Sequence, residues 1–477
     1  MQPEKALPDK GGRFSEWYSA ILEKAELADI RYNVKGFIVY RPNLMRIINL
    51  IRNELEQGLF KDGHQQVMFP LVIPISYLKK EEEHITGFAA EVFKLQSEEG
   101  EEELALRPTS ETAFYPMYSL WIHSYRDLPL KLFQTVNVYR KETKATRPLI
   151  RGREFYWIES HDAFENKEQA LGQVTKDIEI TKEALRKLGL AFVVVEREEW
   201  DKFPGAESTF AFDCLMPDGR VLQIATTHYL GTKFSVPFDV AYLDEDGVKK
   251  NVHQTCFGPG ISRMAAAVIA VHGDEFGLIL PFEVAPVQVA IVPIKNEAQE
   301  KQVVEKAKEI SKKLERLNLR YEVDISEERP GSKYYKWELI GAPVRIEIGG
   351  KELSNHSLTL FRRDTRKRLK IEESKLDEEI RFLEKDLLSN LAGKSRERMD
   401  KSIVRVNNRQ ELLKASQEGK IVLMNFCKRL ECSEELKAGT RGYEIRGRRV
   451  DVVEQVWGKC AWCSGDAIEV AVVAKTF

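Results

Sequence analysis

The sequence predicts three domains: an α+β domain around an antiparallel sheet, an α/β domain and a small α+β domain. Strand-like segments before Pro281 cluster instead of alternating one by one with helices, which favours an antiparallel sheet. After Pro281, an apolar strand and a long amphipathic helix begin an α/β pattern. The length of 477 residues suits three domains of about 150 residues each. We expect these domains to cover residues 1–283, 284–395 and 396–477.

Composition and charge exclude several classes of protein. Hydrophobic residues make up 43% of the chain and charged residues 31%, which excludes a disordered, collagenous or disulfide-scaffold protein. No apolar run approaches the ~18 residues that span a membrane, and residues 1–12 lack the apolar stretch of a signal peptide. We therefore expect a cytoplasmic protein without a membrane partner. The 73 Lys and Arg residues nearly balance the 75 Asp and Glu residues, which still allows local basic patches for nucleic acid.

Hydrophobic periodicity predicts the elements of the first domain. Five apolar residues within 43–56 recur at helical spacing and predict an amphipathic helix: Leu44, Ile47, Ile48, Ile51 and Leu55. Further helices are expected at 110–125, 167–188 and 262–271. Apolar and β-branched runs predict strands at 65–74, 91–97, 103–109, 131–140, 154–164, 191–198, 208–216, 220–230 and 250–258.

The second and third domains show different patterns. A continuous apolar strand at 287–294 precedes a helix with one apolar face, formed by Val303, Val304, Ala307, Ile310, Leu314 and Leu317. A strand at 321–325, a helix at 332–340 and strands at 344–349 and 357–363 complete the second domain. A charged helix at 376–398 is expected to connect it to the third domain, which ends in an apolar strand.

Residues 136–160 combine groups that suit a nucleoside triphosphate. Arg140 and Glu142 share one face of a strand, because alternate residues of a strand point to the same side. Phe155 and Trp157 share one face of the return strand in the same way. Arginine donates planar hydrogen bonds to phosphate, a carboxylate accepts from the exocyclic amine of a purine, and a ring stacks on the base. A solvated hairpin with cross-strand ion pairs is the alternative interpretation.

Four cysteines near the C-terminus predict a metal site. Cys427 and Cys432 form one close pair, and Cys460 and Cys463 form a second pair, with 27 residues between the two pairs. Two thiolate pairs brought together by strands make a tetrahedral Zn²⁺ site. With four ligands there is no open position, so the zinc would be structural. The other two cysteines, Cys214 and Cys256, stand alone and are expected to be buried thiols.

Several motifs resemble the signature motifs of class II aminoacyl-tRNA synthetases. FPLVIP resembles the first motif, which lies at the dimer interface of that class; Arg140-x-Glu142 with Arg151-x-x-x-Phe155 resembles the second; and GPGISRMAAAV resembles the third. RPTSE and ESHDAF narrow the resemblance to the prolyl-tRNA synthetases. The cysteine-bearing C-terminal region and the absence of a large insert are similar to the archaeal and eukaryotic-type branch of that family. The resemblance covers essentially the whole chain.

The resemblance implies a set of ATP contacts. Arg140 and Arg263 are expected to be catalytic, with Arg140 bridging the amino-acid carboxylate and the α-phosphate. The further contacts implied are Glu142 with the adenine amine, Phe155 stacked on adenine, Arg151 and Arg263 at the γ-phosphate, Gln223 and Thr226 at the nucleotide and ribose, and Ser262. This chain lacks the usual acidic residue immediately before Arg263, and Ser262 could instead be the N-cap of the 262–271 helix.

The resemblance also implies a proline pocket. Thr109 and Glu111 offer a hydroxyl and a carboxylate that match the two donors of a secondary ammonium group. The other residues implied at the amino acid are Arg140, Trp157, Glu159, His161 and His228. Thr109 and Glu111 could alternatively cap the 110–125 helix, and His161 could be a hydrogen-bonded core histidine.

The implied activity is ATP-dependent attachment of L-proline to tRNA(Pro) through a prolyl-adenylate, with Mg²⁺ accompanying ATP and the protein acting as a homodimer. A pocket sized for proline rejects smaller amino acids poorly, so we expect alanine and cysteine to be activated and not edited in cis. The alternatives are a class II enzyme for threonine, serine or glycine, a catalytically silent tRNA-binding relative, and a zinc-ribbon nucleic-acid module.

The second domain is the expected contact with the tRNA anticodon. Residues 329–353 resemble an anticodon-binding domain. The aromatic residues and lysines of GSKYYKWE, at the start of a helix, suit stacking on unpaired bases. The basic segment 361–370 suits contact with the tRNA backbone, although it could also be a solvated end of a strand.

Overall fold

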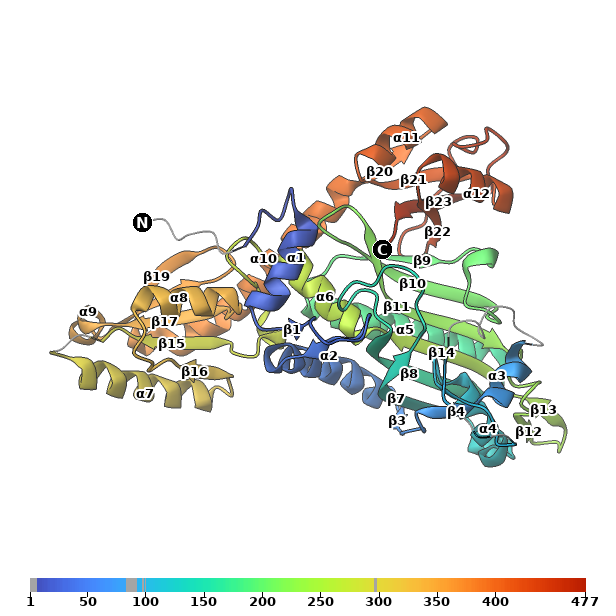
Figure 1. The fold of residues 1–477 in the computed structure, drawn as a ribbon, viewed down its shortest axis with the longest axis horizontal. Helices are drawn as coiled ribbons and strands as arrows, with labels where there is room; N and C mark the ends of the chain where they lie inside the picture. The colour runs from blue at the N-terminus through green and yellow to red at the C-terminus, as the bar shows by residue number, and fades with distance from the viewer. Residues whose placement is uncertain (1–6, 83–91, 97, 99, 296–297) are drawn as a thin grey trace.

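A computed structural model of the chain describes residues 7–82, 92–96, 98, 100–295 and 298–477 (Figure 1). The expected strand at 91–97 is described only in part, as β5 (Phe93–Lys94), and residues 91 and 97 lie outside the described residues, as do residues 1–6. A large mixed α/β body occupies most of Figure 1, with a second unit at its left side and the C-terminal unit at its upper right.

An eleven-stranded sheet organises the body and the C-terminal unit. Its order is β20-β21-β23-β22-β9-β10-β11-β14-β8-β7-β3, and it is antiparallel except at its two outermost pairs, β20–β21 and β3–β7. Its strands from the first part of the chain are β3 (Gln65–Gln66), β7 (Leu130–Tyr139), β8 (Glu154–Phe164), β9 (Val193–Glu196), β10 (Ser208–Leu215), β11 (Val221–Gly231) and β14 (His253–Pro259). The expectation of an antiparallel sheet in an α+β fold is therefore confirmed.

Three helices cover one face of this sheet: α2 (Pro42–Lys61), α5 (Lys167–Lys187) and α6 (Ile261–His272). Helix α6 is almost entirely buried, and its run of alanines allows close packing against the sheet and α2. Because side chains alternate along a strand, every second residue points away from these helices and toward the opposite face of the sheet, where the site lies.

Smaller elements complete the body. They are the helices α1 (Phe14–Lys24), α3 (Ile75–Glu82) and α4 (Glu111–Trp121), and the small sheets formed by β1 (Ala28–Asp29) with β2 (Val39–Tyr40), by β4 (Val72–Pro74), β5 and β6 (Leu104–Leu106), and by β12 (Ala241–Leu243) with β13 (Lys249–Asn251). No helix among the described residues is long and apolar enough to cross a membrane.

The prediction of one strand at 65–74 is wrong. The segment contributes β3 to the large sheet and β4 to a different sheet, with an irregular stretch around Pro70 between them. Side chains satisfy the backbone there: Phe69 N donates to Gln134 Oε1 at 2.9 Å, and Arg107 Nη1 donates to the carbonyl oxygens of Phe69 and Pro70. Proline has no N–H group to donate to a neighbouring strand, so hydrogen bonds from side chains replace strand pairing at this point.

The second unit is a five-stranded sheet of order β16-β15-β17-β18-β19 with helices packed on it. Its elements are β15 (Val289–Pro293), α7 (Glu300–Arg316), β16 (Tyr321–Val323), α8 (Pro330–Leu339), β17 (Val344–Ile348), α9 (Gly350–Ser354), β18 (Ser357–Arg362) and β19 (Lys367–Glu372). Arg363 is fully buried and its guanidinium pairs with the carboxylate of Asp274, which ties this unit to the body.

The C-terminal unit follows α10 (Leu376–Ser402), a 27-residue helix that contains the domain boundary expected at 395. It consists of β20 (Ile403–Val406), α11 (Arg409–Gln417), β21 (Ile421–Phe426), α12 (Leu430–Gly439), β22 (Tyr443–Arg449) and β23 (Glu469–Lys475). Strand β22 pairs with β9 and so joins this unit to the body in one continuous sheet (Figure 1). Gly447 permits the junction, because a Cβ there would lie 1.9 Å from the carbonyl oxygen of Glu196.

Candidate active site

A cavity of about 330 Å³ lies over the sheet face opposite α5 and α6. All the predicted substrate residues except Glu159 and His161 line it: Thr109, Glu111, Arg140, Glu142, Arg151, Phe155, Trp157, Gln223, Thr226, His228, Ser262 and Arg263. They come from the N-terminus of α4, the β7–β8 hairpin, β11 and the start of α6. The structure therefore brings together side chains that are far apart in sequence.

The β7–β8 hairpin positions Arg140 over two rings. Phe155 and Trp157 lie on the same side of β8 and form an edge-to-face pair with centroids 5.5 Å apart. The guanidinium carbon of Arg140 lies 5.1 Å from the Phe155 ring centroid and 5.9 Å from that of Trp157. Its Nε donates to the carbonyl oxygen of Pro108 at 3.1 Å, which orients the rest of the guanidinium.

Two further guanidinium groups converge on the same cavity. Arg263 Nε donates to the carbonyl oxygen of Ile150 and Nη1 to that of Gln223, each at 3.0 Å. Burial, followed by repulsion from Arg140 and Arg151, lowers the pKa of Arg263 to about 10. Three guanidinium groups thus line one cavity, and the carboxylate of Glu142, 3.9 Å from Arg151 Nε, is the acidic group beside them. Guanidinium groups held in this way can bind a multiply charged anion.

The C-terminal residue supports one of these arginines. Arg151 Nη2 donates to a main-chain oxygen of Phe477, and Thr476 forms a β-bridge with Val221 of β11. The guanidinium carbons of Arg147 and Arg220 lie 5.3 Å and 5.1 Å from the Phe477 ring centroid. The tail is therefore docked beside the cavity.

The acidic end of the cavity is built around Glu111. Thr109 Oγ1 donates to Glu111 Oε2 at 2.5 Å, and the thiol of Cys256 lies 3.4 Å from Glu111 Oε1. The N-cap of α4 is Ser110, and no side chain caps this helix end. The capping interpretation of Thr109 and Glu111 is therefore wrong, and both groups remain directed toward the cavity.

Glu159 and His161 lie beneath the cavity, with both side chains fully buried. Glu159 accepts from Ser110 Oγ and from Gln134 Nε2, while His161 contacts Glu159 through Nε2 and the Tyr115 hydroxyl through Nδ1. Burial lowers the pKa of His161, but the carboxylates of Glu111 and Glu159 outweigh it and raise that pKa above its usual value. His161 is thus a hydrogen-bonded core histidine of the layer that supports the cavity floor.

His228 lies between two threonines. Its Nδ1 is 2.9 Å from Thr209 Oγ1, its Nε2 is 3.0 Å from Thr226 Oγ1, and its ring centroid is 4.7 Å from that of Phe203. Burial, followed by the charges of His161 and Arg197, lowers the pKa of His228 to about 3. The imidazole is therefore neutral at physiological pH and contributes hydrogen bonds without a charge.

Ser262 is not the N-cap of α6. The N-cap is Gly260, and the Ser262 hydroxyl instead accepts from Tyr156 N at 3.1 Å, donates to Tyr156 O at 3.2 Å and contacts the Tyr40 hydroxyl. These bonds fix the start of α6, and with it Arg263, against the β8 strand.

Several cavity residues are not identified by the sequence patterns: Arg197, Asp201, Lys202, Phe203, Thr209, Cys256 and Arg446. The pairing of β10 with β11 places Thr209 directly opposite His228, so a correct strand register would have found it. Arg446 comes from the C-terminal unit, and nothing in its neighbouring residues signals the site.

Comparisons with known proteins agree with this geometry. Residues 93–272 match the family model "tRNA synthetase class II core domain (G, H, P, S and T)", and residues 288–383 match "Anticodon binding domain". Two similar relatives are named Proline--tRNA ligase. The one from Thermofilum pendens is 50% identical over 100% of both chains, and the one from Methanopyrus kandleri is 42% identical over 97% of this chain and 96% of its own.

The chain belongs to the proline–tRNA ligases.

Solved structures of this family are similar throughout. The prolyl-tRNA synthetase of Giardia lamblia in complex with prolyl-adenylate has a TM-score of 0.94 at 34% identity and covers 99% of this chain and 100% of its own. That of Cryptosporidium parvum, complexed with L-proline and AMP, has a TM-score of 0.91 at 31% identity and covers 98% and 99%. The family resemblance and the fold expected from the sequence are therefore confirmed. As a proline–tRNA ligase, the chain uses ATP to activate proline and attaches it to tRNA.

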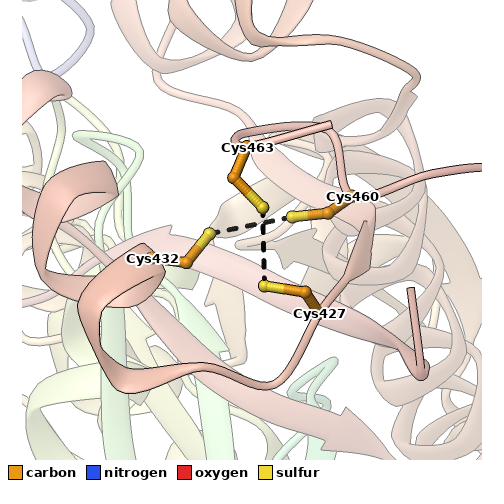
Figure 2. Close-up of side chains that lie close together, drawn as sticks. All are labelled: Cys427, Cys432, Cys460 and Cys463. Carbon is orange, nitrogen blue, oxygen red and sulfur yellow. Dashed lines mark hydrogen bonds between the residues drawn. The ribbon is translucent and has the colours of Figure 1, made fainter. Parts of the chain in front are cut away.

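The four C-terminal cysteines of this proline–tRNA ligase converge in space (Figure 2). Their sulfur atoms all lie within 4.8 Å of one another, with Cys427 and Cys463 3.6 Å apart and Cys432 and Cys460 3.7 Å apart. A disulfide needs about 2.05 Å, whereas the edge of a tetrahedron with zinc–sulfur bonds of about 2.3 Å is about 3.8 Å. Arg429 Nη2 donates to Cys463 Sγ at 3.1 Å and offsets part of the negative charge that four thiolates would carry.

Proposed function

We propose that the arginine-lined part of the cavity binds ATP and the Glu111 end binds proline, so that both reactants meet at Arg140. The convergence of three guanidinium groups and one buried carboxylate in a single cavity carries this proposal. The guanidinium groups suit the phosphates of ATP, and the carboxylate suits the secondary ammonium group of proline.

Each side chain then has a defined contact. Arg140 bridges the proline carboxylate and the α-phosphate, and Glu142 and Phe155 bind the adenine by hydrogen bonding and stacking. The remaining nucleotide contacts are Arg151 and Arg263 with the γ-phosphate, Gln223 and Thr226 with the nucleotide and ribose, and Ser262 through its hold on α6. The proline contacts are Thr109 and Glu111 with the ammonium, and Trp157 and His228 with the ring, supported from below by Glu159 and His161.

This arrangement supports two transfers that need little acid–base catalysis. The proline carboxylate oxygen attacks the α-phosphorus and pyrophosphate leaves, which forms prolyl-adenylate. The terminal ribose hydroxyl of tRNA(Pro) then attacks the prolyl carbonyl carbon, AMP leaves with the bonding electrons, and the hydroxyl proton passes to the departing phosphate oxygen. ATP enters as its Mg²⁺ complex, which screens phosphate charge. Positioning and charge neutralisation by Arg140 and Arg263 supply the catalysis, while His228 remains neutral.

Replacement of Arg140 tests the proposal directly. Because a charge-assisted hydrogen bond contributes about 1.5–3 kcal/mol and Arg140 contacts both reactants, Arg140→Ala should lower the rate of proline-dependent ATP–pyrophosphate exchange at least ~10²-fold. Arg396→Ala, which removes an exposed arginine of α10, is the control and should leave exchange near wild type. Near-normal exchange in Arg140→Ala would refute the assigned roles.

We also propose that alanine and cysteine are activated as side substrates and are not edited in cis. Phe155 and Arg263 lie 263 − 155 = 108 positions apart, and the chain between them forms most of β8, α5 and the strands β9 to β14, which supports the absence of an inserted editing domain. Exchange with alanine and cysteine should be detectable but weaker than with proline, since each missing methylene costs about 10–200-fold. Rapid hydrolysis of alanyl-tRNA(Pro) by the purified protein would contradict the absence of editing.

Contact with tRNA is proposed for the second unit, with a revised set of residues. Of the side chains that suit stacking on bases, Lys333 and Trp337 are buried and bind Asp324. Tyr335 and Lys336 remain exposed on the same helix. In the basic segment, Arg363 is likewise committed to Asp274, and Arg362 to Asp364 and Asp386. The exposed Lys367, Arg368 and Lys370 are therefore the proposed backbone contacts.

We propose a homodimer through the surface around Pro70. Large apolar side chains are exposed there: Met68 at 85%, Leu71, Val72, Leu120 and Trp121. The Phe69 ring lies 6.0 Å from that of Trp121, which joins the two segments into one patch. Sedimentation at micromolar concentration should show a species of twice 54.9 kDa, and Met68→Asp should shift it toward the monomer. A wild-type monomer at that concentration would contradict the proposal.

We propose that the four-cysteine cluster holds one structural Zn²⁺, since its sulfur separations fit a tetrahedral ion. The six cysteines carry free thiols, and free thiols are stable in a reducing compartment. This supports the further proposal that the protein is cytoplasmic. Elemental analysis should find about one zinc per chain, and Cys460→Ser should lose the metal and lower the melting temperature. Cys214→Ser, which changes a buried thiol outside the cluster, should retain the zinc. Stoichiometric zinc in Cys460→Ser, or none in the wild type, would overturn the assignment.

A further inference from the structure

One residue of the C-terminal unit, Arg446, lies in the wall of the active-site cavity. It belongs to β22, whose pairing with β23 shifts register between Ile445 and Gly447, so that Arg446 is the extra residue of a β-bulge. A bulge re-aims the side chain that it displaces. Here it directs the guanidinium of Arg446 across β9 toward β10.

The partner of Arg446 on β10 is Asp213. Arg446 Nε donates to Asp213 Oδ2 at 2.8 Å and Nη2 donates to Oδ1 at 3.0 Å, which makes a bidentate pair between two buried side chains. Burial would raise the pKa of Asp213, but Arg446 and then Arg197 outweigh it and hold that pKa below its usual value. Asp213 is therefore an ionised carboxylate shared by two arginines.

The second of these arginines, Arg197, reaches the cavity. Its Nη1 donates to the carbonyl oxygen of Arg446 at 3.2 Å, its Nη2 donates to Gln223 Oε1 at 2.5 Å, and Nη2 lies 3.6 Å from Asp213 Oδ1. A guanidinium group only donates, so the carboxamide of Gln223 must turn its oxygen toward Arg197. The other end of that carboxamide is an NH₂ group, which donates to acceptors such as ribose or phosphate oxygens.

We propose that Arg446 is a positioning residue for nucleotide binding. Through Asp213 and Arg197 it fixes the carboxamide of Gln223 as a donor toward the nucleotide. The C-terminal unit thereby contributes to the ATP site as well as carrying the cysteine cluster. The inference rests on the proposed contact between Gln223 and the nucleotide.

Replacement of Arg446 by methionine keeps most of the side-chain volume and removes the pair with Asp213. Asp213 then loses the bidentate partner that fixes it, so it no longer orients Arg197 against the oxygen of Gln223. In Arg446→Met we expect the KM for ATP in proline-dependent pyrophosphate exchange to rise about tenfold, with the KM for proline and kcat changed less than twofold. The assay is run below the melting transition of each variant, followed by circular dichroism.

Two comparisons separate positioning from a general loss of structure. Arg448→Met removes an exposed ion pair between the same strand and Glu196 of β9, and it should change the KM for ATP less than twofold. In a Gln223→Ala background, Arg446→Met should add less than a twofold further change, because the residue through which it acts is already gone. If Arg446→Met does not fold, Asp213→Asn gives the same readout, since it removes the carboxylate that links Arg446 to Arg197. The other carboxylate partner of Arg197, Asp201 at 3.0 Å from Nη1, remains in both variants.

The outcomes are distinct. A tenfold rise that disappears in the Gln223→Ala background supports the inference. An unchanged KM for ATP in Arg446→Met, or effects that multiply in the double variant, overturns it. If Gln223→Ala alone leaves the KM for ATP unchanged, the proposed role of Gln223 fails first and the inference fails with it.

Discussion

Repulsion among three guanidinium groups is the constraint on which this active site depends. Arg140, Arg151 and Arg263 point into one cavity, and burial together with the other two charges lowers the pKa of Arg263 to about 10. Main-chain oxygens hold all three groups in place, including that of the last residue of the chain. An anion bound among these groups would relieve this repulsion, and charge that is held in place before the reaction is how a preorganised site lowers a barrier.

The sheet makes this arrangement possible because alternate residues of each strand point to its opposite faces. Along β8, Phe155 and Trp157 face the cavity and Glu159 and His161 continue the same face beneath α4. The opposite face is closed by α2, α5 and α6, while Arg140, Glu142 and Arg151 come from the segment that joins β7 to β8. Alternate residues of the same strands therefore either face the cavity or pack against the helices.

Much of the site can be predicted from the sequence, because its chemistry lies in short local patterns. The signature motifs suffice to assign Arg140, Glu142, Phe155 and Arg263 to one site. The expectation that Arg140 and Glu142 share one face of a strand is wrong, because β7 ends at Tyr139 and both residues lie in the segment that follows it. Tertiary contacts decide the rest, and they leave no such pattern. Trp337 of α8 is buried, and its indole N–H donates to Asp324, which directly follows strand β16. Arg446 reaches the cavity through a β-bulge and the pairing of β22 with β9, neither of which leaves a signal in local sequence.

The most direct measurement is a crystal structure of the enzyme with proline and an ATP analogue that cannot be cleaved. The account predicts the triphosphate among Arg140, Arg151 and Arg263, the adenine on Phe155, and the ammonium of proline at Thr109 and Glu111. A nucleotide bound outside this cavity, or bound with the three guanidinium groups turned away from its phosphates, would contradict it.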